Sequence, residues 1–229
     1  MQADLRARFN ADFTPDKYAA LLRCVNETEK WPADFRVSET PIFLTSEFTD
    51  EVVRAANEIG LNPKMFGGAM IGLLVTPIKM QLGPLMNGIV NNEVFVPAPA
   101  FTFDGTKELL AKYQASAKTQ GIDPLGWAFP PLAYAAGQVL AQAVDGAKSL
   151  DHKALADYMR SHTFLTVVGD ITFGKDGEWA KSRVVFTQFQ NVTGNSLDLF
   201  MDTTHEVVVW PKEYKSGNLI YPYAKAKNP

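Results

Sequence analysis

Few side chains in this sequence have the spacing that catalysis or metal binding requires. The histidines are His152, His162 and His205. His152 and His162 flank one expected helix and would not share a face at metal-ligand spacing. We therefore interpret all three as surface or helix-end residues, and the sequence predicts no bound metal ion and no cofactor.

Acidic residues that are close in sequence are the other candidates for chemistry. They are Asp176 with Glu178 and Asp202 with Glu206, but two carboxyl groups share acid–base work only when both face one substrate. Residues 174–178, GKDGE, are typical of a solvent-exposed hairpin turn. The HExxH, paired CxxC, GxSxG and GxxxxGK(S/T) motifs do not occur in the sequence. We therefore assign no catalytic residue and predict that the protein is not an enzyme.

The composition is that of an ordinary globular chain. Of the 229 residues, 46% are hydrophobic and 21% are charged, and the net charge is −3. This length admits one large domain or two small lobes. No basic block is interleaved with aromatic residues, so nucleic acid is not an expected partner. The longest apolar run, residues 70–78, is too short to span a bilayer. The single cysteine, Cys24, excludes an intramolecular disulfide.

The elements that would position the polar residues alternate between helix and strand. Gly60 is a C-terminal stop for one helix, Gly67-Gly68 breaks a strand, and Pro97 forbids a regular helix after the next strand. Such alternation indicates an α/β fold with a largely parallel sheet. The apolar spacing predicts helices at 16–30, 49–59, 70–82, 106–120, 132–144 and 151–162, and strands at 42–44, 65–66 and 88–96.

The pattern changes after residue 162. Short runs of strand type follow, several of them separated by Gly-rich turns. The tail from 211 to 229 is polar and aromatic and has no clear periodicity. The strand-type runs lie at 167–173, 184–189, 197–201 and 206–209.

Five segments in a fixed order, from about Val52 to Lys227, resemble one protein family. Each segment alone is a weak signal, but together they resemble the periplasmic solute-binding proteins of the Leu/Ile/Val-binding type. The segments are VVRAANEIGLNPK-MFGG (52–68), LGPLMNGIV (82–90), WAFPPLAYAAGQ (127–138), TVVGDITFGKDGE (166–178) and VVVWPKEYKSG with IYPY (207–217 and 220–223).

The resemblance implies a type I periplasmic-binding-protein fold, in which two α/β lobes are joined by a hinge. Residues 51–96 would then be part of lobe two, residues 97–183 part of lobe one, and residues 184–229 the hinge return and C-terminal tail. Residues 1–50 match the family poorly, and the start of the chain lacks the apolar stretch of a secretory signal. We therefore expect a chain that is incomplete at its N-terminus, with the first lobe only partly present.

The resemblance also implies a function. It is that of a periplasmic, non-catalytic substrate-binding component of an ABC importer for amino acids or related small organic acids. The expected partners are this ligand and the transporter permease, with no nucleic acid and no membrane span. Two alternatives stay open: a ligand-sensing regulatory domain of the same fold, and a small α/β enzyme without a recognisable motif. With part of one lobe absent, we expect the chain alone to bind weakly or not at all.

One wall of the ligand cleft is expected after the strand at 65–66. Ligands of open α/β sheets lie at the carboxyl ends of strands. Gly67 and Gly68 would allow close backbone approach, and Phe66, Ala69 and Met70 would supply apolar contacts. The resemblance places Ala69 where amino-acid-binding members carry an acid for the ligand ammonium, which makes an aromatic or aliphatic acid a plausible ligand. The alternative for Phe66 to Gly68 is a plain structural turn.

The second expected wall is aromatic. Trp127, Phe129 and Tyr134 lie in or just after a Gly- and Pro-rich loop that precedes a helix. A rigid aromatic loop of this kind suits a hydrophobic ligand. The alternative is that the three rings pack against the core of the lobe.

Overall fold

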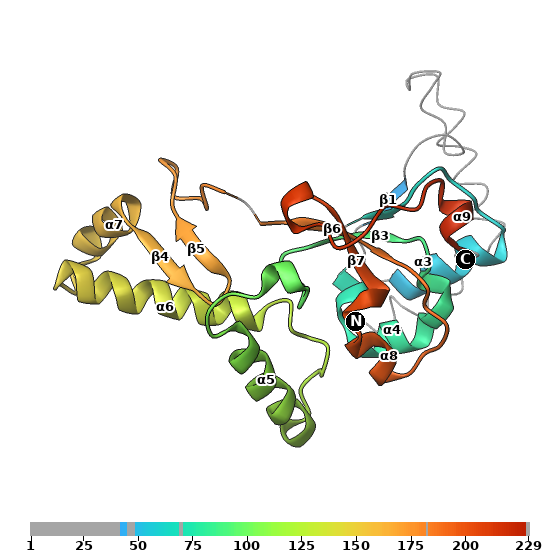
Figure 1. Ribbon diagram of the computed structural model, residues 1–229, viewed down its shortest axis with the longest axis horizontal. Coiled ribbons are helices and arrows are strands. Elements are labelled where there is room, and N and C mark those ends of the chain that lie inside the picture. The colour runs from blue at the N-terminus through green and yellow to red at the C-terminus, as the bar shows by residue number, and fades with distance from the viewer. Residues whose placement is uncertain (1–41, 45–48, 69–70, 182, 228–229) are drawn as a thin grey trace, which may run out of the picture.

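The apolar segments build two bodies that lie side by side along the long axis of the molecule (Figure 1). One contains a five-stranded sheet and the other contains the longest helices. We call them the sheet body (residues 42–93 and 185–227) and the helix body (residues 95–181). The structure is a computed structural model that describes residues 42–44, 49–68, 71–181 and 183–227.

The strands of the sheet body follow the order β1-β2-β3-β6-β7. β1, β2 and β3 run parallel, whereas β6 is antiparallel to β3 and β7 is antiparallel to β6. The expected parallel sheet is thus found for β1 to β3 only, because β6 brings the chain back from the helix body toward which β3 leaves. The bounds are β1 (Ile42–Leu44), β2 (Phe66–Gly68), β3 (Val90–Glu93), β6 (Val185–Phe189) and β7 (Glu206–Trp210).

The helices of the sheet body bury a first apolar core. They are α3 (Thr49–Glu58), α4 (Thr76–Leu82), α8 (Leu197–Met201) and α9 (Tyr223–Lys227). Phe66 of β2 meets the ring of Tyr223 edge to face, with 5.4 Å between ring centroids, so the short helix α9 closes this core. Its buried members include Val53, Ala56, Leu73, Leu82, Met86, Ile89, Leu125, Trp127, Phe189, Val192 and Phe200.

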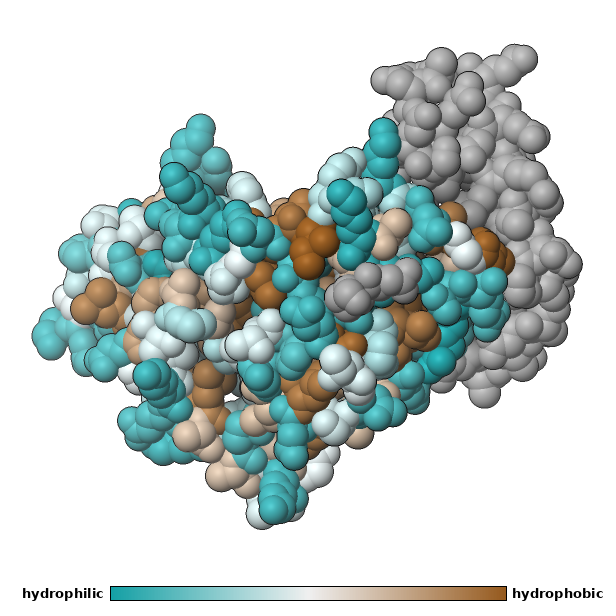
Figure 2. Space-filling model, turned by 45° about the vertical axis from the view of Figure 1, so that its right-hand side comes forward, coloured by the Kyte–Doolittle hydropathy of each residue, from teal (hydrophilic) through white to brown (hydrophobic). Residues whose placement is uncertain are grey.

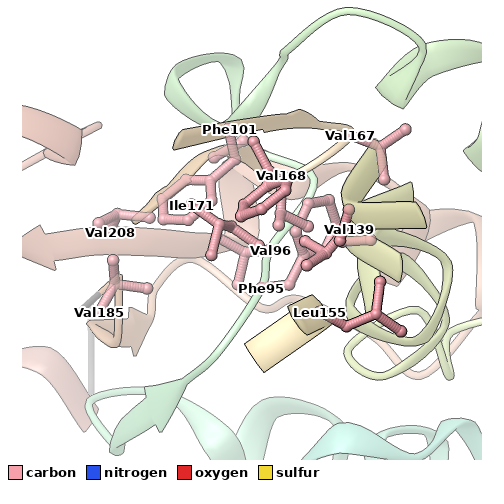
Figure 3. Close-up of a cluster of buried hydrophobic side chains, with 14 residues drawn as sticks. Phe95, Val96, Phe101, Val139, Leu155, Val167, Val168, Ile171, Val185 and Val208 are labelled. Carbon is pink, nitrogen blue, oxygen red and sulfur yellow. The ribbon is translucent and has the colours of Figure 1, made fainter. Parts of the chain in front are cut away.

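The helix body contains a second core, which Figure 3 shows in close-up. It is built by α5 (Thr106–Gln120), α6 (Pro130–Ala147), α7 (His152–Ser161) and the antiparallel hairpin of β4 (Thr163–Thr166) and β5 (Gly169–Thr172). Asp151 caps α7, because its side chain accepts a 2.9 Å hydrogen bond from the backbone N–H of Ala154. Buried members include Phe95, Val96, Phe101, Val139, Ala143, Leu155, Phe164, Val167, Ile171, Val185 and Val208.

Several sequence predictions are confirmed. Helices are found where they were expected at 49–59, 106–120 and 151–162, and α3 ends before Gly60, which has a φ of 66°. The turn at 174–178 closes through a 2.8 Å bond from the Gly174 N–H to the Glu178 carbonyl. The helix expected at 16–30 lies outside the described residues.

Other predictions are wrong in identifiable ways. The run 197–201 is the helix α8 and not a strand, because Ser196 caps it by accepting a bond from the Leu199 N–H. The run 167–173 is not one strand, because the chain turns at Val167 and Val168 between β4 and β5. Likewise, β2 continues through Gly67 and Gly68 instead of breaking there, and β3 covers only part of 88–96.

The segment 70–82 divides into two short helices instead of forming one. The 3-10 helix η1 (Ile71–Leu74) precedes α4, and Val75 between them is extended. Pro77 explains the break, because its ring would clash with a carbonyl of a continuous helix but fits the first turn of a new one. The remaining 3-10 helices are η2 (Gly83–Met86), η3 (Pro99–Phe101), η4 (Thr203–His205) and η5 (Lys212–Tyr214). In the described part of the chain no helix has both the length and the apolar character needed to cross a membrane.

Gly67 sets the spacing between β2 and β3. It pairs with Val90, and a Cβ atom at position 67 would lie 2.1 Å from the Val90 carbonyl oxygen. That distance is far inside van der Waals contact, and the obstacle is backbone that cannot rotate away. The two strands therefore need glycine here.

We predict that Gly67→Ala destabilises the fold by about 1–3 kcal/mol, because β3 must shift away from β2. The matched control is Gly137→Ala on α6, where an added Cβ meets nothing within 4 Å. The control should be neutral or gain up to about 1 kcal/mol from helix propensity. Urea unfolding of both variants measures the difference, and equal stability of the two would refute the packing argument.

Candidate functional site

A small cavity lies where the two bodies meet. Its volume is about 10 Å³, which is room for a single water molecule. The lining comes from both bodies and from the strands between them: Leu74, Lys79, Glu93, Phe95, Val96, Leu125, Trp127, Ala128 and Glu206.

Charged and polar side chains from four elements converge beside this cavity. The Lys79 Nζ of α4 donates to Oε2 of Glu206 on β7 at 2.8 Å. Glu93, at the end of β3, accepts a 2.8 Å bond on Oε1 from Nδ2 of Asn91. Thr187 of β6 donates to Oε1 of Glu206 at 3.4 Å. Lys79 and Glu93 are each only 2% exposed, so this junction cluster (Lys79, Glu93, Asn91, Thr187, Glu206) is shielded from solvent.

The cluster holds two carboxyl groups but only one cation. Burial raises the pKa of Glu93 well above its ordinary value, and the nearby charge and hydrogen bond of Glu206 raise it further, while Lys79 and Asn91 act in the opposite direction. Since Lys79 is paired with Glu206, Glu93 is the carboxyl whose protonated form this site favours. Its hydrogen bond with Glu206 links β3 to β7 across β6.

A second polar link crosses between the bodies at Asp123, in the loop between α5 and α6. Its carboxylate accepts bonds from the backbone N–H of Thr76 (2.9 Å), from the Thr76 hydroxyl and from the Leu125 N–H (2.9 Å). The Tyr113 hydroxyl donates to the Asp123 carbonyl at 2.6 Å. Val75 supplies no side-chain cap to α4, so Asp123 caps this helix from the other body.

A larger pocket of about 270 Å³ lies between the helix body and the two chain segments that connect it to the sheet body. Its lining is Val94, Leu132, Glu178, Trp179, Arg183 and Val184. The guanidinium of Arg183 lies 4.9 Å from the ring centroid of Phe103 and 5.2 Å from that of Trp179. It donates to the carbonyls of Val168 and Asp170. Arg183 is therefore occupied in holding the β4–β5 turn against the chain that leads into β6.

The structure describes three of the five residues predicted for the first wall of the ligand cleft. Phe66, Gly67 and Gly68 are buried in β2, and neither cavity described above is lined by them. Gly67 is used by the close approach of β3. Ala69 and Met70 lie outside the described residues. The assignment of these five residues to a ligand stays a prediction.

The predicted aromatic wall is divided between the core and the surface. Trp127 is 7% exposed and lines the small cavity. Phe129 and Tyr134, at the start of α6, are 58% and 52% exposed. The structure therefore brings Trp127 to the junction cluster and leaves the other two rings open to solvent. Figure 2 shows apolar surface gathered toward the middle of the face in view.

The junction cluster was not found from sequence. Glu93 is visible as a carboxyl within the predicted strand 88–96, and that is the one signal available. Its partners are distant in sequence: the strand order β3-β6-β7 brings Glu206 to it, and the packing of α4 brings Lys79. The described residues contain no group of His, Cys, Asp or Glu side chains that could hold a metal ion.

Comparison with known proteins agrees with this architecture. The sequence model of a family described as "Periplasmic binding protein" matches residues 42–194, which is more than half of the chain. The protein therefore belongs to the periplasmic binding protein family. No curated protein sequence matches the chain.

Solved structures are similar in fold. Leucine binding protein LivK from Thermotoga maritima is 20% identical with a TM-score of 0.54, and the match covers 77% of this chain and 46% of that one. An ABC transporter substrate-binding protein from Desulfitobacterium hafniense is 21% identical (TM-score 0.50; 75% and 46% covered). A periplasmic binding protein from Burkholderia mallei is 13% identical (0.51; 82% and 44%).

These structures confirm the predicted α/β fold of the periplasmic-binding-protein type, and the match to the family model confirms the family resemblance. At such identities the likeness establishes the fold alone. The matched part spans less than half the length of each of the three proteins.

We predict that Lys79→Met destabilises the protein by about 3–5 kcal/mol at neutral pH, because two carboxyl groups, Glu93 and Glu206, would remain at the junction without a cation. Lys112→Met is the control, since the exposed pair of Lys112 with Glu108 spans one helical turn on the surface and should add nothing measurable. Urea unfolding at neutral pH tests both, and a harmless Lys79→Met would contradict the geometry.

Proposed function

We propose that this protein is the substrate-binding component of an ABC importer and acts without catalysis. The family membership supports this reading, as do the names of the similar structures, which include a leucine binding protein and an ABC transporter substrate-binding protein. The observation that carries the proposal is the pair of separate apolar cores joined by adjacent strands. That arrangement suits two bodies that close on a ligand.

The proposed lobes follow the two bodies. Residues 51–96 belong to lobe two, residues 97–183 to lobe one, and residues 184–229 to the hinge return and tail. In support, the first core draws mainly on residues before 90 and after 188, and the second core mainly on residues between them. The exceptions are Leu125 and Trp127, which come from the helix body and pack in the first core, and Val208, which comes from the sheet body and packs in the second.

The proposed ligand is an amino acid or a related small organic acid. Phe66 to Met70 would form one wall, and Trp127, Phe129 and Tyr134 the other. The exposed rings of Phe129 and Tyr134 provide apolar surface that a ligand side chain could cover. Because Ala69 offers no carboxylate, an aliphatic or aromatic acid fits this wall better than an α-amino acid.

The junction cluster does not favour the enzyme alternative. A buried carboxyl with a raised pKa is typical of active sites. However, the cavity beside Glu93 has a volume of about 10 Å³, and a substrate needs far more room than one water. The cluster is better explained as part of the connection between the bodies. On this reading the protein works outside the cytoplasm and delivers its ligand to a permease.

Thermal unfolding in the presence of candidate ligands tests the proposal. The panel is leucine, valine, phenylalanine and the corresponding acids that lack the amino group. We expect saturable but weak stabilisation by one class, amounting to about 1.4 kcal/mol when the ligand is at ten times its Kd. If a compound of another chemical class stabilises the protein while no member of the panel does, the proposed ligand class is wrong.

Phe129→Ala should weaken this binding about tenfold, since it removes an aromatic contact worth about 1.4 kcal/mol. Stability without ligand should change by less than about 0.5 kcal/mol because the ring is exposed. Leu150→Ala is the control, because Leu150 is also exposed but lies between α6 and α7. Binding that is unchanged in Phe129→Ala, or equally weakened in Leu150→Ala, would remove Phe129 from the site.

A further inference from the structure

The junction cluster lies on the strands that connect the two bodies. Glu93 is the last residue of β3, just before the chain enters the helix body, and Glu206 is the first residue of β7. β6 lies between them, and its Thr187 pairs with Asn91 on one side and with Val208 on the other. A change in the angle between the bodies must therefore bend the backbone that carries these carboxyl groups.

The charges facing Glu93 come from a short list of elements. Among the residues that line the cavity, the charged ones are Lys79 from α4, Glu206 from β7 and Glu93 itself. Asn91 of β3 and Thr187 of β6 add neutral hydrogen bonds. The helix body contributes apolar lining without charge: Phe95, Val96, Leu125, Trp127 and Ala128.

The charges of the junction cluster cancel only when one of its two carboxyl groups is protonated. With that proton, Lys79 neutralises Glu206, and Glu93 is a neutral donor to it. Without the proton, two carboxylates share one ammonium in a space that admits about one water molecule. A second buried anion without a partner is costly, and hydration from outside relieves the cost.

We propose that the junction is a proton-controlled hinge: Glu93 carries a proton beside the Lys79–Glu206 ion pair when the two bodies are packed together, and loss of that proton opens the junction to water. The apolar lining from the helix body then separates from the charged side chains on α4, β3 and β7. This device depends on the connection between the bodies and not on the identity of any ligand.

The direction of the pH effect follows from the raised pKa of Glu93. Below its ordinary value of 4.5 the group is protonated in both the folded and the unfolded chain. Above 4.5 the unfolded chain releases this proton while the folded chain keeps it, so the folded state loses relative stability as the pH rises. The decline continues until the pH passes the raised folded pKa, where the junction opens.

Urea unfolding across the pH range from 4 to 9 tests the hinge with Glu93→Gln, which imitates the protonated carboxyl. Above pH 4.5, the ratio of folded to unfolded protein should fall for the native sequence by up to about tenfold for each pH unit. This fall is measured relative to Glu93→Gln, which lacks the titrating carboxyl. Glu58→Gln, an exposed glutamate at the end of α3, is the control and should keep the native pH profile. Identical profiles for the native sequence and Glu93→Gln would overturn the proposal.

Amide hydrogen exchange then locates the opening. After correction for the intrinsic pH dependence of exchange, protection of residues 90–96 and 185–189 should fall as the pH rises, while protection of α7 stays constant. Glu93→Gln should abolish this local loss. A carboxyl NMR titration of the native protein covers the case of a variant that fails to fold, and an ordinary pKa for Glu93, or a uniform loss of protection, would contradict the hinge.

Discussion

The chain passes between the two bodies at two adjacent strands, and polar side chains beside these strands hold the bodies together. β3 leaves the sheet body, β6 returns to it, and β7 lies against β6. The junction cluster and Asp123 supply the polar contacts there. The two apolar cores alone would not fix the orientation of one body relative to the other. The buried hydrogen bonds, which tolerate little error in distance, are what select one orientation.

The sequence predicted the parts of the fold that local patterns determine. α3, α5 and α7 carry their own start or stop residues, such as Asp151 and Gly60. Predictions failed where a single residue overrode an apolar pattern. Ser196 starts the helix α8 in a run predicted as a strand, and Pro77 starts α4 within a run predicted as one continuous helix. The junction cluster could not be predicted, because the meeting of Glu93 with Glu206 depends on strand order and not on spacing.

The two predicted walls of the ligand site could not be assigned equally well from the sequence. Family resemblance pointed to both walls, but local pattern cannot distinguish a ring that faces a ligand from one that faces a core. Trp127 and Phe129 are neighbours in the same loop, and yet one is buried and the other exposed. Both residues lie in the turn that precedes α6, and this turn directs their side chains differently. Such a difference of two positions decides whether an aromatic side chain is buried in the core or open to solvent.

The contact between Phe66 and Tyr223 has a consequence for biosynthesis. Early and late segments of the chain share the first core. Chains emerge from the ribosome from the N-terminus onward, and domains fold as units. The helix body is contiguous and can form while translation continues. The sheet body must wait, with the apolar faces of β2 and α3 uncovered, until Tyr223 has left the exit tunnel, so this half is the one that most needs chaperone protection.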